Sequence, residues 1–387
     1  MVKIFRKIHL WLSVPFGIII TLICFSGAML VFEPEITRSI RSKVYYVASS
    51  QGEPLPMDTL MGKIKSILPD SVSITGVTVF ADKDRTYQVS LSKPRRASMF
   101  IDQYSGDITG KYERLKFFSI MIRLHRWLLD SSNPHGEGVK TGKLIVGIST
   151  VIFVISLITG VVIWWPRVRN GFRRSLKITT KKGWRGFWKS LHVAGGMYVL
   201  VLVLVMALTG LTWSFDWYRS AFYAVCGVEY TPRGHSAKNA KNNHDVYEVG
   251  RKRMTEWKGH IETHHKQSEF DGWQQVYNEL KSHNPEAPQI TIGVDKASVA
   301  HGDAGNGRAS DTYIYNHGPD KVRLSVRYVD SAPADKLRGW IYSIHTGSFG
   351  GLITRILWFI SALLGANLPI TGYYIWIRHL MKRNHEV

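Results

Sequence analysis

Four histidines of this sequence stand beside long apolar runs, in two matching pairs. His9 and His192 each open an apolar run, and His125 and His345 each precede one. Two histidines at one depth on neighbouring helices can bind a haem iron from both sides, and such ligation favours electron transfer over oxygen chemistry. Ionisable side chains within or beside membrane spans are costly and usually functional. The sequence therefore predicts two haem b groups per chain, one on His9 and His192 and one on His125 and His345.

Glycines recur in phase with these histidines. Gly27 follows His9 by 18 residues, and Gly210 follows His192 by 18 residues. Because 18 residues make five helical turns, or about 27 Å, each glycine lies on the face of its histidine at the other end of the helix. A glycine there lets a flat macrocycle approach the backbone. Two more glycines near the ends of the returning runs complete the predicted cofactor-binding set: Gly160 and Gly372.

Other interpretations of these residues stay open. The histidines could be interfacial side chains, and the glycines could be helix-packing contacts, which are common in membranes. His379 is a competing cytoplasmic ligand beyond the fourth run, but the first half has no equivalent of it. The histidine-rich segment 235–265 could bind a metal, although its spacing matches no defined site. The absence of a Cys-x-x-Cys-His motif predicts that the haem is not covalently attached.

Four uncharged apolar runs predict an α-helical membrane protein. Each run has about 22 residues, enough to cross a hydrocarbon core of about 30 Å. The first run is too long for the core of a signal peptide and is expected to be an uncleaved anchor. The predicted boundaries are 1–32, 144–165, 192–215 and 356–377 for the four transmembrane helices, 33–143 and 216–355 for two outer domains, 166–191 for a basic loop and 378–387 for the tail.

Basic residues set the predicted orientation. The loop 166–191 carries nine Lys and Arg residues and no acidic residue. Short basic loops stay in the cytoplasm, so both termini are predicted to be cytoplasmic and the segments 33–143 and 216–355 periplasmic. The formal net charge of +21 gathers beside the apolar runs, which indicates membrane orientation and not a nucleic-acid partner.

The chain reads as two repeats of a helix, a periplasmic domain and a returning helix. Thr159-Gly160 and Thr371-Gly372 occupy matching places in the two returning helices. Each outer segment predicts an α+β fold from its alternating apolar residues and turn signals. The predicted elements are helices at 57–68 and 273–281, strands at 72–79, 86–91, 290–294, 312–315 and 322–329, a hairpin at 99–108 and a loop at 301–310.

The motifs Arg-Lys-x-His at 6–9, Trp-Lys-Ser-Leu-His at 188–192 and Leu-Pro-Ile-Thr-Gly at 368–372 resemble the PepSY-associated transmembrane family. The hairpin 101–107 resembles the end of a PepSY module, and the resemblance covers nearly the whole chain. Members of that family include iron-regulated inner-membrane proteins and ferric-siderophore reductases. The resemblance thus implies a haem-bearing oxidoreductase of the bacterial inner membrane that acts on iron chelates in the periplasm.

Two functions from different classes follow. In the first, electrons pass from the cytoplasmic haem to the outer haem and on to a ferric siderophore or another periplasmic acceptor. No GxGxxG loop for a flavin or nicotinamide is present, so a quinol or a separate reductase is the expected donor. In the second, the protein is a haem-free sensor or peptidase regulator. A transporter fits less well, because the runs lack the buried charges of many transport paths.

Overall fold

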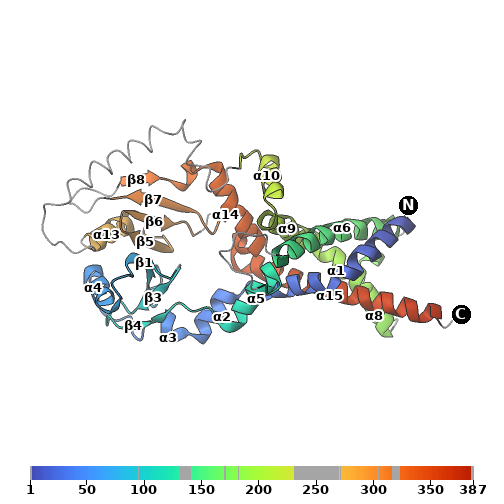
Figure 1. The fold of residues 1–387 in the computed structure, drawn as a ribbon, viewed down its shortest axis with the longest axis horizontal. Coiled ribbons are helices and arrows are strands. Elements are labelled where there is room, and N and C mark those ends of the chain that lie inside the picture. The colour runs from blue at the N-terminus through green and yellow to red at the C-terminus, as the bar shows by residue number, and fades with distance from the viewer. Residues whose placement is uncertain are drawn as a thin grey trace.

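The computed structural model describes residues 2–94, 96–130, 141–169, 171–181, 183–230, 270, 272–302, 305–315 and 323–384. Figure 1 shows a β-sheet with its covering helices at one end and a bundle of long helices at the other. Both chain termini lie at the far end of the bundle, remote from the sheet. The chain therefore leaves the bundle toward the sheet twice and returns twice.

Four helices among the described residues are long and apolar enough to cross a membrane. They are α1 (Val2–Leu30), α6 (Thr141–Arg169), the continuous run of α8 (Gly183–Ser190), η1 (Leu191–Gly195) and α9 (Gly196–Ser214), and α15 (Gly351–Asn384). This confirms the four predicted helices. Three of them run well past the predicted limits, because a helix continues through its charged flanks where the apolar residues stop. At its C-terminal end, however, the third helix stops one residue before the predicted limit, because the extended backbone of Phe215 ends α9.

The long helices pack around an apolar centre. α1 packs on α6 and α15, and α9 packs on the same two helices. The central buried residues are Ile20, Phe153, Leu157, Val199, Val203 and Ala207. Other large apolar side chains of these helices, such as Ile18 and Ile353, are exposed, as the lipid-facing surface of a bundle requires.

One eight-stranded antiparallel sheet contains the strands of both outer segments. Its order is β4-β3-β2-β1-β5-β6-β7-β8. The strands are β1 (Ile74–Phe80), β2 (Tyr87–Leu91), β3 (Ser98–Ile101), β4 (Ile108–Lys111), β5 (Gln289–Gly293), β6 (Lys296–Ala300), β7 (Ser310–Ile314) and β8 (Arg323–Val326). The two segments meet where β1 pairs with β5, from Gly76 opposite Gly293 to Phe80 opposite Gln289.

The outer segments also share one hydrophobic core. Helices α4 (Met57–Ile67) and α13 (Trp273–His283) contribute Met61 and Trp273, both fully buried, to the same cluster as Val77 and Ile292. The prediction of two separate outer domains, 33–143 and 216–355, needs correction. A strand at the edge of a half-sheet leaves its backbone groups unpaired, and each half satisfies these groups with the other half.

Most predicted elements of this region are confirmed. The helices at 57–68 and 273–281, the hairpin at 99–108 and the strands at 72–79, 86–91, 290–294 and 312–315 match observed elements within a few residues. β6 had not been predicted, because its small residues give a weak strand pattern. The strand predicted at 322–329 ends at Val326, and Tyr328–Asp330 forms a 3₁₀ turn, η3.

Short helices connect the sheet to the bundle. They are α2 (Glu33–Ile40), α3 (Ser42–Tyr45), α5 (Lys116–Trp127), α10 (Asp216–Val225), α14 (Pro333–Thr346) and the 3₁₀ turn η4 (Ser348–Gly350). On the other side of the bundle, α7 (Phe172–Ser175) lies between α6 and α8. The sequence patterns had not predicted α5 or α14, and these two helices carry His125 and His345.

Candidate functional site

The four histidines form two close pairs at different levels of the bundle. His9 of α1 and His192 of η1 have ring centroids 6.4 Å apart, with an angle of 84° between the ring planes. His125 of α5 and His345 of α14 have ring centroids 6.1 Å apart, at 49°. We name these the terminus-side pair (His9 and His192) and the sheet-side pair (His125 and His345).

Both spacings fit two imidazoles that share one metal ion. A metal–nitrogen distance of about 2.0 Å on each side, with each ring centre roughly 1.2 Å behind its nitrogen, separates the centroids by about 6.4 Å. The observed values of 6.4 Å and 6.1 Å lie near this figure. Ring contacts without a metal also span about 4.5–7 Å, so the spacing is compatible with a shared ion and does not require one.

Hydrogen bonds fix which nitrogen of each ring could bind a metal. Nδ1 of His9 lies 3.0 Å from the carbonyl oxygen of Ser156 and 3.0 Å from Oγ1 of Thr159. A carbonyl only accepts, so Nδ1 carries the proton and donates it. The remaining nitrogen, Nε2, keeps its lone pair for a ligand. Metal-binding histidines use their second nitrogen in this way, which holds the ring orientation and the tautomer.

The same arrangement occurs at the other three histidines. Each acceptor is a backbone carbonyl four residues before one of the four predicted glycines. The acceptors are Leu368 for His192 at 3.0 Å, Ile23 for His125 at 2.9 Å and Met206 for His345 at 3.0 Å. Every histidine is therefore oriented by a long helix other than the one that carries it.

A hydroxyl residue stands directly before each glycine. Its side chain donates a hydrogen bond to the carbonyl that receives the histidine. The four donors are Ser26 to Ile23 at 3.1 Å, Thr159 to Ser156 at 3.0 Å, Thr209 to Met206 at 3.1 Å and Thr371 to Leu368 at 2.8 Å. The sequence analysis had not assigned these residues a role. The recurring Ser/Thr-Gly dipeptide was the signal that could have identified them.

The four glycines make room for the histidine rings. A Cβ atom on Gly27 would lie 2.8 Å from Cε1 of His125, and one on Gly210 would lie 3.1 Å from Cε1 of His345. The corresponding distances are 3.5 Å at Gly372, beside His192, and 3.8 Å at Gly160, beside His9. Each glycine thus contacts an imidazole that its own helix orients, and the sheet-side pair has the tighter fit.

A π-helical turn carries His192. The turn Leu191–Gly195 lies inside the third long helix and follows the i to i+5 pattern. Such turns insert an extra residue into an α-helix and are frequent at functional sites. Within this turn, Nδ1 of His192 lies 3.0 Å from the carbonyl oxygen of Leu368.

Burial favours the neutral form of the sheet-side pair. Desolvation lowers the pKa of His125, and desolvation together with the nearby His125 lowers the pKa of His345 to about 4. A neutral imidazole is the form that binds metals. The ring of Trp213 lies 5.1 Å from that of His345 and helps to exclude water.

The other candidate histidines lie elsewhere. His379 is exposed near the end of α15 and takes no part in either pair. The histidine-rich segment 235–265 lies outside the described residues. In the described part of the chain, no group of three or more His, Cys, Asp or Glu side chains could hold a metal ion. The two histidine pairs are therefore the strongest candidates there.

A sequence match with the family described as PepSY-associated TM region extends over residues 6–379. The chain belongs to the PepSY-associated TM region family. The matched region includes both histidine pairs and all four glycines. Among curated proteins, none matches the chain. Family membership and the four long apolar helices together make the protein a multi-pass membrane protein.

Proposed function

We propose that the protein is a di-haem b electron-transfer protein of the bacterial inner membrane. The terminus-side pair holds one haem, and the sheet-side pair holds the other. Haem iron with two histidine ligands supplies one-electron chemistry and has no open position for oxygen. The oxidoreductase activity that fits this arrangement is the reduction of a ferric siderophore outside the membrane, with electrons from a quinol or a separate reductase on the terminus side.

One observation carries the proposal. In both pairs, Nδ1 of each ring donates to a backbone carbonyl of a long helix, while the ring centroids lie 6.4 Å and 6.1 Å apart. These hydrogen bonds leave the four Nε2 atoms, two at each level, free to bind a metal, and the centroid separations are compatible with an iron between the rings of each pair. Ordinary interfacial histidines have no reason to share this geometry.

The orientation of the protein follows from its charges. The short basic segment between α6 and α9 lies at the same end of the bundle as both termini (Figure 1). Such segments stay in the cytoplasm. We therefore place the terminus-side pair near the cytoplasm and the sheet in the periplasm.

A pyridine haemochrome assay on the full-length protein, purified from an iron-replete host, tests the proposal. We expect two non-covalent haem b groups per chain and a low-spin absorption spectrum. One haem per chain would leave one pair without a function. A colourless protein would contradict the proposal and favour the haem-free sensor or peptidase regulator.

A further inference from the structure

Helix α10, which follows the third long helix, has an uncharged outer face. Residues three and four positions apart share one face of a helix, and the exposed ones here are Trp217, Ser220, Ala221, Ala224 and Val225. Trp217 is 67% exposed and Val225 is 90% exposed. The charged residues of α10, Asp216 and Arg219, lie in its first turn and pair with each other at 3.3 Å. A helix that faces water usually turns charged residues outward, and the outer face of α10 has none.

The opposite face of α10 is held by the protein. Tyr223 is buried, and its ring lies 5.1 Å from that of Tyr230. Nε of Arg219 donates a 2.6 Å hydrogen bond to the carbonyl oxygen of Thr212 in α9. A second guanidinium nitrogen of Arg219 donates a 2.8 Å hydrogen bond to the hydroxyl of Tyr230. These contacts fix α10 against the end of α9, so its outer face has a defined direction.

The residue before α10 shows how deep this helix lies. A Cβ atom on Gly147 would lie 2.6 Å from Cζ of Phe215, so the ring of Phe215 packs directly on α6. Gly147 belongs to the apolar run 144–165, about 4.5 Å from its sheet-side end at 1.5 Å per residue. The ring of Trp217 stacks on that of Phe215, with centroids 5.8 Å apart. Trp217 is therefore at the boundary between hydrocarbon and headgroups, where tryptophan is enriched in membrane proteins.

The direction of α10 agrees with this depth. Figure 1 shows α10 crosswise to the long helices, at the end of the bundle nearest the sheet. A helix in this position runs along the membrane surface and not through the membrane. Its aromatic row continues from Trp217 to Tyr218 and Phe222, with ring centroids 5.8 Å and 6.1 Å apart. The amphipathic rings of Trp and Tyr sit at the level of lipid headgroups in membrane proteins.

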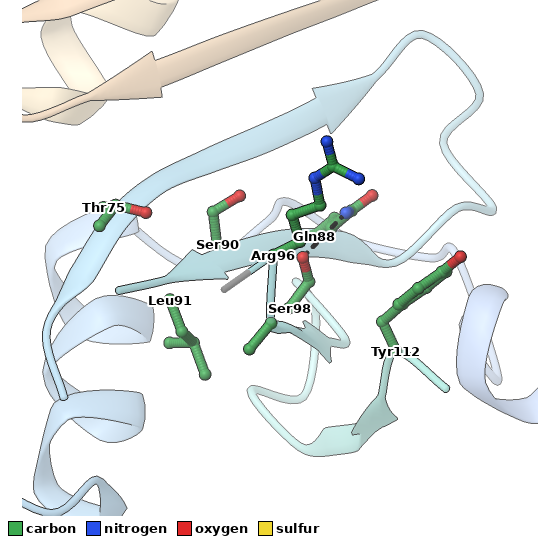
Figure 2. A pocket seen from close by; sticks show the side chains of 8 residues that line it. Thr75, Gln88, Ser90, Leu91, Arg96, Ser98 and Tyr112 are labelled. Atoms are coloured by element: carbon green, nitrogen blue, oxygen red, sulfur yellow. Dashed lines mark hydrogen bonds between the residues drawn. The ribbon is translucent and has the colours of Figure 1, made fainter. Parts of the chain in front are cut away.

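The exposed surface of the sheet has a different character. A cavity of about 510 Å³ opens on it, and Figure 2 shows the side chains of Thr75, Gln88, Ser90 and Arg96 around this cavity. Hydroxyl, amide and guanidinium groups form hydrogen bonds with water. The outer face of α10 offers mainly an indole ring and methyl groups instead. The comparison favours lipid over water as the surroundings of α10.

We propose that α10 is an interfacial helix whose outer face rests in the phospholipid leaflet on the sheet side of the membrane. Interfacial helices bury their apolar face about 5–10 Å into the boundary between headgroups and acyl chains. The lipid contact of α10 continues the lipid-facing surface of the bundle, since Phe215 joins the two through α6. The inference concerns lipid contact alone and holds whether or not the histidine pairs bind haem.

Spin labels measure the depth of this helix. In a Cys24→Ala, Cys226→Ser background, nitroxides are attached to single cysteines from Trp217→Cys, Ala221→Cys and Val225→Cys in the full-length protein in phospholipid nanodiscs. Power-saturation electron paramagnetic resonance compares collisions with oxygen, which concentrates in acyl chains, and with a nickel chelate, which stays in water. We expect oxygen collisions to exceed nickel collisions at all three positions, at one common depth. A helix that left the membrane would rise by about 6 Å between successive labels, and such a gradient would overturn the inference.

Two further positions calibrate the measurement. Val329→Cys is the matched control, because Val329 is a valine that is 64% exposed in η3, beside the sheet, and its label should meet the nickel chelate more often than oxygen. Ile18→Cys in α1, at a position 65% exposed, is the lipid reference. A label at Val225 that matches Val329 would contradict lipid contact. Low collision rates with both reagents would mean that protein covers α10, either a second copy, detected by dipolar broadening, or another part of the chain, and would also contradict it.

Discussion

The hydrogen bond at Nδ1 gives each histidine a partner helix as well as a partner histidine. His9 is held by α6 and its partner His192 by α15, so the two ligands of one pair depend on different long helices. An iron between the rings of a pair would thus connect four helices. Loss of either ring opens the site, because six-coordinate low-spin iron needs both axial nitrogens.

Replacement of the histidines should therefore give two matching sets of spectra. His9→Ala and His192→Ala should each remove about half of the haem absorbance and leave identical residual spectra. His125→Ala should match His345→Ala in the same way, with the other half retained. Reduced-minus-oxidised difference spectra of the four purified variants provide the measurement. A spectrum shared by His9→Ala and His345→Ala would show that the ligands pair differently.

The glycines should differ in their tolerance of a methyl group. Gly27→Ala places Cβ at 2.8 Å from the ring of His125 and must displace it, whereas Gly160→Ala leaves an ordinary contact of 3.8 Å to His9. We expect Gly27→Ala to lower the content of the sheet-side haem or shift its electron paramagnetic resonance spectrum. Gly160→Ala is the matched control and should resemble the unaltered protein. Equal effects of the two changes would rule out a steric role for Gly27.

Residue types and matching positions beside the four apolar runs were enough to predict the histidine pairs, because they put the two members of each pair at one depth of the membrane. The partner of each Nδ1 could not be predicted in the same way. Ser156 and Leu368 accept through backbone carbonyls, and every residue type has one. Only the packing of α1 on α6, and of η1 on α15, determines which carbonyl a ring reaches.

At the scale of elements, an ion pair connects α2 to α15 at the end of the bundle that lies nearest the sheet. Arg355, near the start of α15, donates to both carboxylate oxygens of Glu35 in α2 at 2.7 Å, and also to the carbonyl of Val31. The side chain of Arg355 also lies over the ring of Phe32, at 5.1 Å. This contact connects the first turn after α1 to the last long helix.

The ion pair should contribute a pH-dependent part of the stability. The hydrogen bond from Arg355 lowers the pKa of Glu35 in the folded protein. The stabilisation by this ion pair is therefore complete above the pKa of Glu35 in the unfolded chain, about 4.3, and is lost as the pH falls through the lower pKa of the folded protein. Glu35 is 41% exposed in its side chain, so Glu35→Gln should cost no more than about 1 kcal/mol at neutral pH.

Thermal unfolding of the two proteins from pH 7 down to pH 3 measures this contribution. The difference between Glu35→Gln and the unaltered protein should shrink toward zero at the acidic end. Glu113→Gln is the control, because its partner Arg41 is bound at 3.2 Å through a carboxylate that is 68% exposed. A difference that stays constant with pH would contradict an ionic contribution from Glu35.

Long helices were the most predictable elements, and the connecting helices were the least. Uninterrupted apolar runs identify α1, α6, α9 and α15 without tertiary information. α5 and α14 are short and carry charged residues among their apolar ones, so neither stands out as an uninterrupted apolar run. The π-helical turn at His192 packs against α15, and its residues have no special composition.

At the scale of the molecule, the two halves of the sheet should unfold together. Among the described strands, the two halves meet at β1 and β5, where Cβ of an alanine at position 76 would lie 2.7 Å from the carbonyl oxygen of Ile292. Gly76→Ala should therefore separate these strands and reduce hydrogen-exchange protection in β2 and β6 alike. Gly62→Ala in α4 meets no atom within 4 Å and serves as the control. Loss of protection in one half alone would mean that each half folds independently.

The proposed membrane orientation predicts on which side of the membrane a reporter fused to the protein lies. A fusion at Thr180, in the basic segment, should behave as cytoplasmic, and a fusion at Ser90, in β2, should behave as exported. Alkaline phosphatase and green fluorescent protein fusions at both positions provide opposite readouts. Reversed activities would overturn the assignment of the sheet to the periplasm and with it the direction of electron flow.

Local patterns predicted most strands of the two outer segments but assigned them to two domains, whereas all eight strands lie in one sheet. Strand pairing between Val77 and Ile292 joins residues more than 200 positions apart, and local sequence patterns contain no information about such contacts. A half-sheet and a full sheet show the same alternation along each strand. Only the shared burial of Met61 and Trp273 reveals a single core.

The shared sheet also has a consequence for folding during synthesis of the chain. β1 ends at Phe80, and its partner strand begins at Gln289. At a synthesis rate of about 5–20 residues per second, roughly 10–40 s pass before the second strand exists. During that time two further helices must enter the bilayer, while β1 presents an unpaired edge of the kind that aggregates. The first outer segment therefore exposes an unpaired strand edge until the second outer segment has been synthesised.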